Sequence, residues 1–337
     1  MRNAFAQELT ALAAADERIV LLSGDIGNRL FDTFKSTFPS RFFNCGVAEA
    51  NMTGIAAGLA LCGLRPVTYT ITAFNTVRCL EQIRIDVCCQ NLPVVIVGVG
   101  AGLSYASLNP THHALEDIAL LRVLPNMTVI CPGDPFEVRC AVRAAILHNG
   151  PVYIRLGKKN EPVVHKQIPD FSIGKGIIIS PGTDVCLLST GTMLPAAVEA
   201  AELLKEKAVS AQVVSMHTVK PLDAGLLQEV FKSFSLVITL EEHSRLGGFG
   251  GAVAEWLTDQ TESKGRLLRL GTADSFICKA ADQKFGRQLS GLLPEQIADK
   301  VLQSLQNNNK SGKGSTVYEN NRRRPGRDRQ AVSARRP

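Results

Sequence analysis

Short apolar runs alternate with amphipathic segments along most of the chain. The runs are rich in Val, Ile and Leu and are bounded by Gly, Pro or Asn, which is typical of buried strands. The segments between them repeat apolar residues with a helical period. We expect strands at 19–23, 65–72, 92–100, 127–131, 151–156, 184–191, 212–216 and 236–243 and helices at 2–16, 30–38, 76–91, 114–122, 135–148, 194–206 and 252–259.

This alternation predicts an α/β fold with parallel open sheets covered by helices on both faces. The chain has 337 residues, 45% of them hydrophobic, which is enough for two domains. A polar stretch that begins at Gly157 separates them. We expect a first domain at 1–160, a linker at 161–172, a smaller second domain at 173–306 and a disordered basic tail at 307–337.

The formal net charge of +6 belongs to the tail. Residues 308–337 contain seven arginines and two lysines against two acidic residues, so the rest of the chain is close to neutral. We therefore expect no nucleic-acid surface on the domains. No apolar run reaches the roughly 18 residues that span a bilayer, and the N-terminus leads into a mixed helix. We expect a cytoplasmic protein that does not bind membranes.

The nine cysteines form neither a CxxC pair nor a Cys/His cluster with zinc spacing. Most of them lie in apolar or helical contexts and are expected to be buried free thiols of a reducing compartment. These are Cys62, Cys79, Cys88, Cys89, Cys131, Cys140 and Cys186.

The stretch 41–60 indicates a more specific chemistry. A short aromatic run predicts a strand, Cys45–Gly46 predict a turn, and a helix rich in Ala and Gly follows. Glu49 is the only ionisable residue of this helix and lies near its first turn. It is either an ordinary acid at a solvated helix start or a carboxyl whose proton affinity is tuned by apolar neighbours and the helix terminus. Small residues such as Gly54 and Gly58 allow other backbone to approach closely, which favours a buried helix.

Further candidate residues follow the predicted strands, at the edge where open α/β sheets bind ligands. Asp25 and Phe74 lie just after two of these strands, and His112 lies near the end of a long loop, 101–113. Long loops between a strand and a helix are often functional, and histidine carries protons near neutral pH. Structural roles remain open for each: a turn cap for Asp25, core packing for Phe74 and a backbone hydrogen bond for His112.

The stretch 41–60 resembles the pyrimidine-binding domain of the transketolase family of thiamine-diphosphate enzymes. The resemblance extends from about residue 2 to about residue 305 and implies a second domain of the transketolase C-terminal type. It implies thiamine diphosphate as the cofactor and Glu49 as the catalytic carboxyl. In the family, this carboxyl hydrogen-bonds N1′ of the aminopyrimidine and favours the imino tautomer that takes the proton from thiazolium C2.

The same resemblance implies roles for four other residues. Phe74 matches the residue that stacks on the aminopyrimidine, and Asp25 matches one near the cofactor at the subunit interface. His112 matches a loop histidine beside the substrate, which implies that it binds substrate and assists proton transfer. Lys158 falls where transketolases commonly have an arginine for the substrate phosphate. Gly100 stands where the family has a histidine that grips a sugar phosphate, so ordinary pentose-phosphate exchange is not implied.

A second cofactor motif of the family, Gly-Asp-Gly followed by Asn, does not occur in this chain. Neither Gly24–Asp25–Ile26 nor Gly133–Asp134–Pro135 fits it. The chain therefore resembles the C-terminal half of a split transketolase, with no metal site of its own. We expect Mg²⁺ and its ligands on an N-terminal partner subunit, activity only with that partner, and an α2β2 assembly or a homodimer of this chain.

The implied reaction is the transfer of a two-carbon ketol unit from a ketose to an aldose, with small sugars or sugar phosphates as substrates. Three alternatives remain open: the β subunit of a 2-oxo acid dehydrogenase, a half resembling 1-deoxy-xylulose-5-phosphate synthase, and a non-catalytic scaffold subunit. The run Gly247–Gly251 is either a phosphate cradle at a helix N-terminus or a tight turn that starts the helix.

Overall fold

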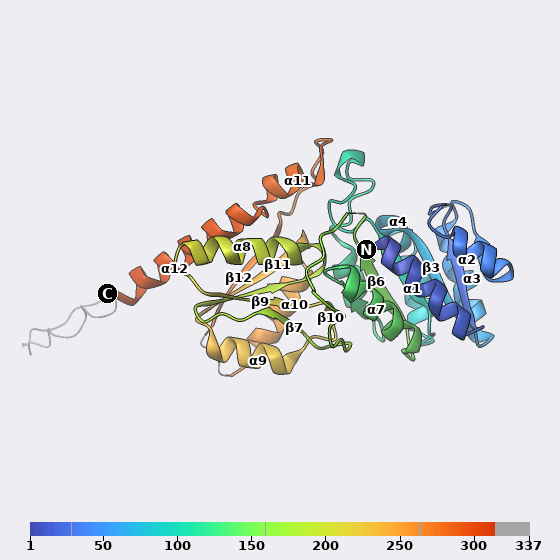
Figure 1. Ribbon diagram of the computed structural model, residues 1–337, viewed down its shortest axis with the longest axis horizontal. Helices are drawn as coiled ribbons and strands as arrows, with labels where there is room; N and C mark the ends of the chain where they lie inside the picture. The colour runs from blue at the N-terminus through green and yellow to red at the C-terminus, as the bar shows by residue number, and fades with distance from the viewer. Residues whose placement is uncertain (28, 159, 262, 264, 314–337) are drawn as a thin grey trace, which may run out of the picture.

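The computed structural model describes residues 1–313 apart from 28, 159, 262 and 264, with side chains to residue 307. Two α/β domains lie along the long axis of the molecule, with the N-terminus near their junction and α12 at the far end (Figure 1). Each domain is an open sheet with helices on both faces, so the predicted fold class is confirmed.

The first sheet has seven strands in the order β10-β5-β6-β4-β3-β1-β2, and every pair is parallel except β10 with β5. Its strands are β1 (Ile19–Ser23), β2 (Phe42–Asn44), β3 (Arg65–Ile71), β4 (Val95–Val99), β5 (Thr128–Ile130), β6 (Val152–Leu156) and β10 (Thr218–Lys220). The helices are α1 (Arg2–Ala15), α2 (Asp32–Thr37), α3 (Glu49–Leu61), α4 (Thr72–Thr76), α5 (Leu80–Gln82), α6 (Asp117–Arg122) and α7 (Pro135–Leu147). Short turns are the 3-10 turns η1 (Pro39–Arg41) and η3 (Ala106–Leu108) and the π-helical turn η2 (Ile83–Cys88).

Apolar side chains on both faces keep this sheet in the middle of its domain. The helices α1, α2 and α7 cover one face, where Phe5, Phe34 and Val138 join the core. On the other face, Met52 of α3 and Leu121 of α6 belong to the core. The strands β1, β4 and β6 are buried along their whole length, which is why the sequence shows them as mainly apolar runs.

The second sheet has five strands in the order β12-β11-β8-β9-β7, parallel except for β7 with β9. Its strands are β7 (Ile177–Ser180), β8 (Val185–Ser189), β9 (Ala211–Ser215), β11 (Leu236–Ser244) and β12 (Arg266–Thr272). The helices are α8 (Leu194–Glu206), α9 (Ala224–Ser233), α10 (Phe249–Thr258), α11 (Gln283–Ser290) and α12 (Pro294–Lys313), with a 3-10 turn η4 (Gly191–Met193). The helices α8 and α12 cover one face, and α9 and α10 cover the other (Figure 1).

The chain crosses between the two sheets after β9. Residues 218–220 form β10, which is the antiparallel edge strand of the first sheet, with Thr218 opposite Ile130. The sequence does not predict this strand, because three residues carry little periodicity and their pairing partner lies in the other domain. The first sheet is therefore mixed, and part of the second domain's chain completes it.

The described residues of the predicted linker, 161–172, form no helix or strand. Asp134, the N-cap of α7, fixes the linker to the first domain. Its carboxylate accepts hydrogen bonds from the backbone N–H groups of Val164 and His165, at 3.0 and 2.9 Å. The linker is thus irregular but anchored.

The helix predicted over 76–91 is wrong as a single element: α4 begins earlier, at Thr72, and the chain then passes through α5 into the π-helical turn η2. At the other end of the chain, α12 continues to Lys313, past residue 307, where the predicted tail begins. The rest of that tail lies outside the described residues.

All nine cysteines are free thiols. Five of the seven that were expected to be buried are buried, but Cys62 and Cys89 are exposed, so the prediction is wrong for these two. Both follow the end of a helical segment that packs on the sheet through its other face. In the part of the chain that the structure describes, no helix is both long and apolar enough to cross a membrane.

Candidate active site

The sequence-predicted site residues lie at one edge of the first sheet. Asp25 follows β1, Phe74 lies in the helix that follows β3, and Lys158 follows β6. Glu49 begins α3, which follows β2, and the loop 101–113, called the His112 loop below, follows β4. Because these strands are parallel, their carboxyl ends meet at the same edge, where open α/β sheets place their ligands.

Glu49 is buried at the start of α3, with only 2% of its surface exposed. Its Oε2 accepts a hydrogen bond of 2.7 Å from Nη1 of Arg78. The loop after β1 passes close by, since a Cβ on Gly24 would lie 3.5 Å from Glu49 Cγ. The interpretation of Glu49 as a solvated helix-start acid is therefore wrong, and its carboxylate is held by a guanidinium.

Arg78 also joins Glu49 to the predicted stacking residue. Its guanidinium carbon lies 4.5 Å from the centre of the Phe74 ring, a cation–π distance. The Phe74 ring in turn meets the His112 ring edge to face, with centroids 5.1 Å apart. The structure thus brings Glu49, Phe74 and His112 into one connected cluster, in which Arg78 is the link.

His112 is half-buried in its loop. Its Nδ1 lies 2.9 Å from the Thr111 hydroxyl, so the other ring nitrogen is left for chemistry. Desolvation, assisted by the neighbouring His113, lowers the pKa of His112 below its usual value. The shift favours the neutral imidazole, which is the form that can accept a proton from a substrate. His113 is 4% exposed and its Nε2 lies 3.4 Å from the Ala106 carbonyl, which is a structural contact inside the loop.

Tyr105 extends the cluster toward Lys158. Its ring centroid lies 6.1 Å from that of His112, and Lys158 Nζ lies 4.4 Å from the ring. Tyr105 also explains the residue that replaces the family histidine. Gly100 has φ +85°, and a Cβ there would lie 2.1 Å from Tyr105 Cε2, so only glycine fits beneath the tyrosine ring.

Asp25 lies at the same edge but outside this cluster. Its side chain is exposed, and Oδ1 accepts a hydrogen bond of 2.9 Å from the Asn44 amide. Its φ of +56° places the backbone in the left-handed region, where Asp is among the more tolerant residues. Asp25 thus makes a contact that stabilises the turn after β1, and its role toward a ligand stays a prediction.

Two expectations for glycine-rich segments change. In α3, no atom lies within 4 Å of a Cβ placed on Gly54 or Gly58, so only one face of this helix is buried in the chain itself. At the run 247–251, the Glu241 carboxylate accepts hydrogen bonds from the first N–H groups of α10, those of Phe249 and Gly250. The segment is therefore a capped helix start, and the phosphate-cradle alternative is wrong.

Sequence reasoning missed Arg78 and Tyr105. Arg78 had a usable signal, because it follows Phe74 by four residues, which is about one helical turn. Tyr105 had a weaker one, as the aromatic residue in the loop that contains His112. Neither residue can be assigned to the site without the contacts that it makes in the folded chain.

Comparisons with known proteins agree with this geometry. The sequence model described as the pyrimidine-binding domain of transketolase matches residues 1–163, and that of the transketolase C-terminal domain matches residues 174–297. A Methanocaldococcus jannaschii protein assigned as a transketolase C-terminal section is 37% identical over 90% of this chain and 96% of its own length. The chain belongs to the transketolase family.

Other transketolase relatives match at a similar level. The 6-deoxy-6-sulfo-D-fructose transketolase subunit SqwH of a Clostridium species is 36% identical over 82% of this chain and 85% of its own length. A split-gene transketolase solved as an inactive beta4 tetramer is 36% identical, with a TM-score of 0.81 over 90% of this chain and 97% of that one. The 1-deoxy-D-xylulose-5-phosphate synthase of Chlorobium phaeovibrioides is 35% identical, but this chain spans only 47% of its length.

The transketolase family implies thiamine diphosphate, and the cluster fits the aminopyrimidine part of it. The planar Arg78 guanidinium lies between Glu49 and Phe74, where it donates to the carboxylate and lies over the ring. A flat heterocycle with a ring N–H would make the same two contacts. In the described part of the chain, no group of three His, Cys, Asp or Glu side chains is arranged to hold a metal ion.

Proposed function

We propose that this chain is the C-terminal subunit of a two-component, thiamine-diphosphate-dependent transketolase. The assembled enzyme would move a two-carbon ketol unit from a ketose to an aldose. The observation that carries the proposal is the cluster of buried Glu49, Arg78, Phe74 and His112 at the ligand-binding edge of a transketolase pyrimidine-binding domain.

Three residues of the cluster, and Asp25 outside it, have roles in this proposal. Glu49 would hold N1′ of the aminopyrimidine, and Phe74 would stack on the ring. When bound, thiamine diphosphate supplies the electron sink for the two-carbon unit. His112, neutral because of its lowered pKa, would accept or return a proton at a substrate hydroxyl. Asp25 would help to orient the cofactor at the subunit boundary.

The Mg²⁺ and diphosphate site belongs, in this proposal, to an N-terminal partner subunit. Support comes from exposed apolar side chains just before α3, along α3 and in the turn after α4, where a partner subunit could cover them. Val47, Ile55, Leu61 and Val77 are 74%, 41%, 63% and 52% exposed. The beta-only tetramer of the related split-gene enzyme is inactive, which agrees with a required partner. We propose an α2β2 assembly in the cytoplasm, with a homodimer of this chain alone as the alternative.

Small sugars or sugar phosphates are the proposed substrates. Two relatives at 35% and 36% identity are named for different sugars, apulose 4-phosphate and 6-deoxy-6-sulfo-D-fructose, and both sugars carry an anionic group. Lys158 lies near the His112 loop and would pair with such an anion as a point charge.

A half enzyme of the 1-deoxy-xylulose-5-phosphate synthase type is the second candidate, favoured by the 35% identity to that enzyme over 89% of this chain. The two candidates differ in the bond that is cleaved in the donor. A transketolase releases an aldose and no carbon dioxide, whereas the synthase decarboxylates a 2-oxo acid. Assaying both donors with the reconstituted enzyme therefore separates them.

The test is calorimetric titration of thiamine diphosphate with Mg²⁺ into this chain alone and into its mixture with the N-terminal subunit. We expect binding in the mixture only. Glu49→Gln should then lower ketol transfer by at least about a hundredfold, because the proton at N1′ loses its carboxylate partner. Unchanged activity in this variant would support the scaffold interpretation instead.

A further inference from the structure

Glu242 of the second domain contacts the His112 loop of the first. It belongs to β11, and its carboxylate is fully buried. Its Oε1 accepts a hydrogen bond of 2.7 Å from the backbone N–H of Leu103. Gly102 packs directly on it: φ is +59°, and a Cβ there would lie 2.5 Å from Oε1. The first residues of the loop therefore pack directly on this carboxylate.

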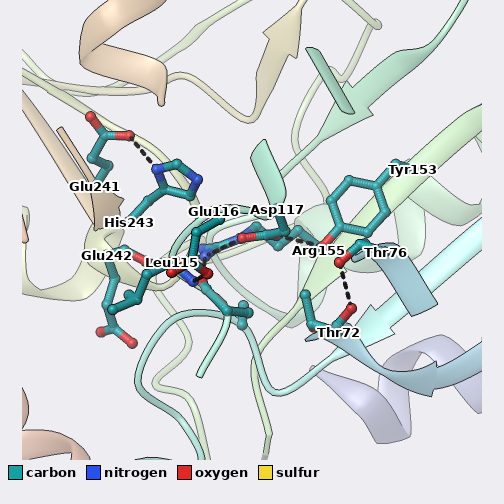
Figure 2. A network of polar contacts seen from close by, with 12 residues as sticks. Thr72, Thr76, Leu115, Glu116, Asp117, Tyr153, Arg155, Glu241, Glu242 and His243 are labelled. Carbon is teal, nitrogen blue, oxygen red and sulfur yellow. Dashed lines mark hydrogen bonds and ion pairs between the residues drawn. The ribbon is translucent and has the colours of Figure 1, made fainter. Parts of the chain in front are cut away.

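The two ends of the loop are fixed at the same place. Gly102 and Ala114 exchange backbone hydrogen bonds of 3.1 and 3.0 Å, which close the loop at its base. Nη2 of the buried Arg155 donates to the carbonyls of Ala114 and Glu242, at 2.7 and 3.0 Å. Figure 2 shows Arg155 held in turn by Asp117, which its Nε reaches at 2.7 Å. The Glu242 carboxylate thus bonds directly to the start of the loop. Its backbone carbonyl is linked through Arg155 to Ala114, at the end of the loop.

The second domain also fixes Glu242 itself. Nε2 of Gln283 donates to Glu242 Oε1 at 2.8 Å, and the Arg287 guanidinium pairs with Oε2. Both partners lie on α11, which belongs to the second domain. At this contact between the domains, the buried Glu242 carboxylate accepts hydrogen bonds from donors of both domains.

Contacts inside the loop carry this constraint to the catalytic side chain. Leu103 is buried together with Ala106 of the loop and Leu115, which follows it, in a small apolar cluster. The Ala106 carbonyl meets the ring of His113, the residue next to His112. An anchored Leu103 thus limits where His112 can lie relative to Phe74.

We propose that Glu242 is a positioning residue, through which the second domain fixes the His112 loop in its catalytic arrangement. The part that concerns His112 chemistry rests on the proposed function. The part that concerns loop order does not, because it follows from the contacts alone.

Glu241 offers a matched control one residue away. It is also a buried carboxylate of β11, but it caps α10 and makes no hydrogen bond or ion pair with the described residues of the His112 loop. We would compare Glu242→Met with Glu241→Met, since both remove a buried acceptor and keep a similar volume. Glu242→Gln retains an oxygen that can accept from Leu103 and serves as the conservative variant.

The first readout is hydrogen exchange of the backbone amides 103–113, measured on the full chain. Glu242→Met should speed this exchange by about tenfold or more, Glu242→Gln by less, and Glu241→Met not at all. In the enzyme reconstituted with its partner, Glu242→Met should lower kcat by about tenfold or more, with thiamine-diphosphate affinity unchanged, because His112 is displaced.

Unchanged exchange in Glu242→Met, or equal acceleration in Glu241→Met, would overturn the proposal. If Glu242→Met does not fold, the exchange of Glu242→Gln decides in the same way. If the reconstituted enzyme transfers no ketol unit, the proposed function fails, and the exchange measurement still decides whether Glu242 positions the loop.

Discussion

Single residues of the site could be found from the sequence where the local pattern sets their place. Glu49 and Phe74 lie just after parallel strands of the first sheet, and His112 lies in a loop after a third such strand. Their convergence therefore needs only the order of these strands. Arg78 and Tyr105 could not be assigned in this way. The contact of Arg78 with Glu49 depends on how the chain turns after α4, and the place of Tyr105 depends on the glycine beneath it.

Arg78 should stabilise the chain through Glu49. The Arg78 side chain is 48% exposed, so solvent screens part of the interaction, and we expect a coupling energy on the order of 1 kcal/mol. A double-mutant cycle with Glu49→Gln and Arg78→Met, measured by urea unfolding, isolates this coupling. The exposed pair Arg84–Glu81 is the control and should give no more than about 0.5 kcal/mol. Equal coupling energies for the two pairs would contradict the expectation.

Secondary-structure elements were predictable where one pattern dominates. The fully buried strands β1, β4 and β6 and the capped helix α7 lie where the sequence places them. The helix expected at 76–91 is interrupted, partly because Thr76 and Val77 are β-branched residues with low helix propensity. The strand β10 was missed because its three residues pair with β5 of the other domain, and the periodicity of so short a segment does not indicate a distant pairing partner.

The His112 loop should depend on Gly100, the glycine that precedes it. Gly100→Ala introduces a methyl group at φ +85° and against the Tyr105 ring. Gly63→Ala is the matched control, since φ is +88° there and no atom lies within 4 Å of the new Cβ. Backbone strain alone should cost about 1–2 kcal/mol in both variants.

The difference between these two variants should come from the collision with Tyr105. We expect Gly100→Ala to be the less stable in urea unfolding, and to speed hydrogen exchange in the His112 loop while Gly63→Ala does not. Equal stability of the two variants would mean that the tyrosine ring moves aside without cost.

At the scale of the whole molecule, the sequence predicts two domains and their order but not how they join. The junction is made of contacts between residues far apart in the chain. Asp134 binds the linker at Val164 and His165, and the ring of His217 stacks on Phe171 with centroids 3.9 Å apart. None of these pairs has a local signature, because each becomes a pair only after both sheets have formed.

His217 makes this junction sensitive to acid. It lies between β9 of the second sheet and β10 of the first, with its side chain fully buried. Burial lowers its pKa to about 3, and the nearby His165 acts in the same direction. The folded state therefore favours the neutral ring. The free energy of unfolding contributed by the neutral His217 ring is fully present above the unfolded pKa of about 6.5. It is lost as the pH falls toward the folded pKa of about 3.

This dependence can be isolated by comparing the wild type with His217→Gln, which cannot titrate at this position. From pH 8 to 6.5, the difference between their unfolding free energies should stay constant. Below pH 6.5, the wild type should lose stability relative to the variant by about 1.4 kcal/mol per pH unit, because one proton is taken up on unfolding. His148→Gln, at a less buried histidine, should show a weaker dependence. A difference that stays flat down to pH 5 would mean that the ring is protonated in the folded state, and that the junction tolerates a charge beside Phe171.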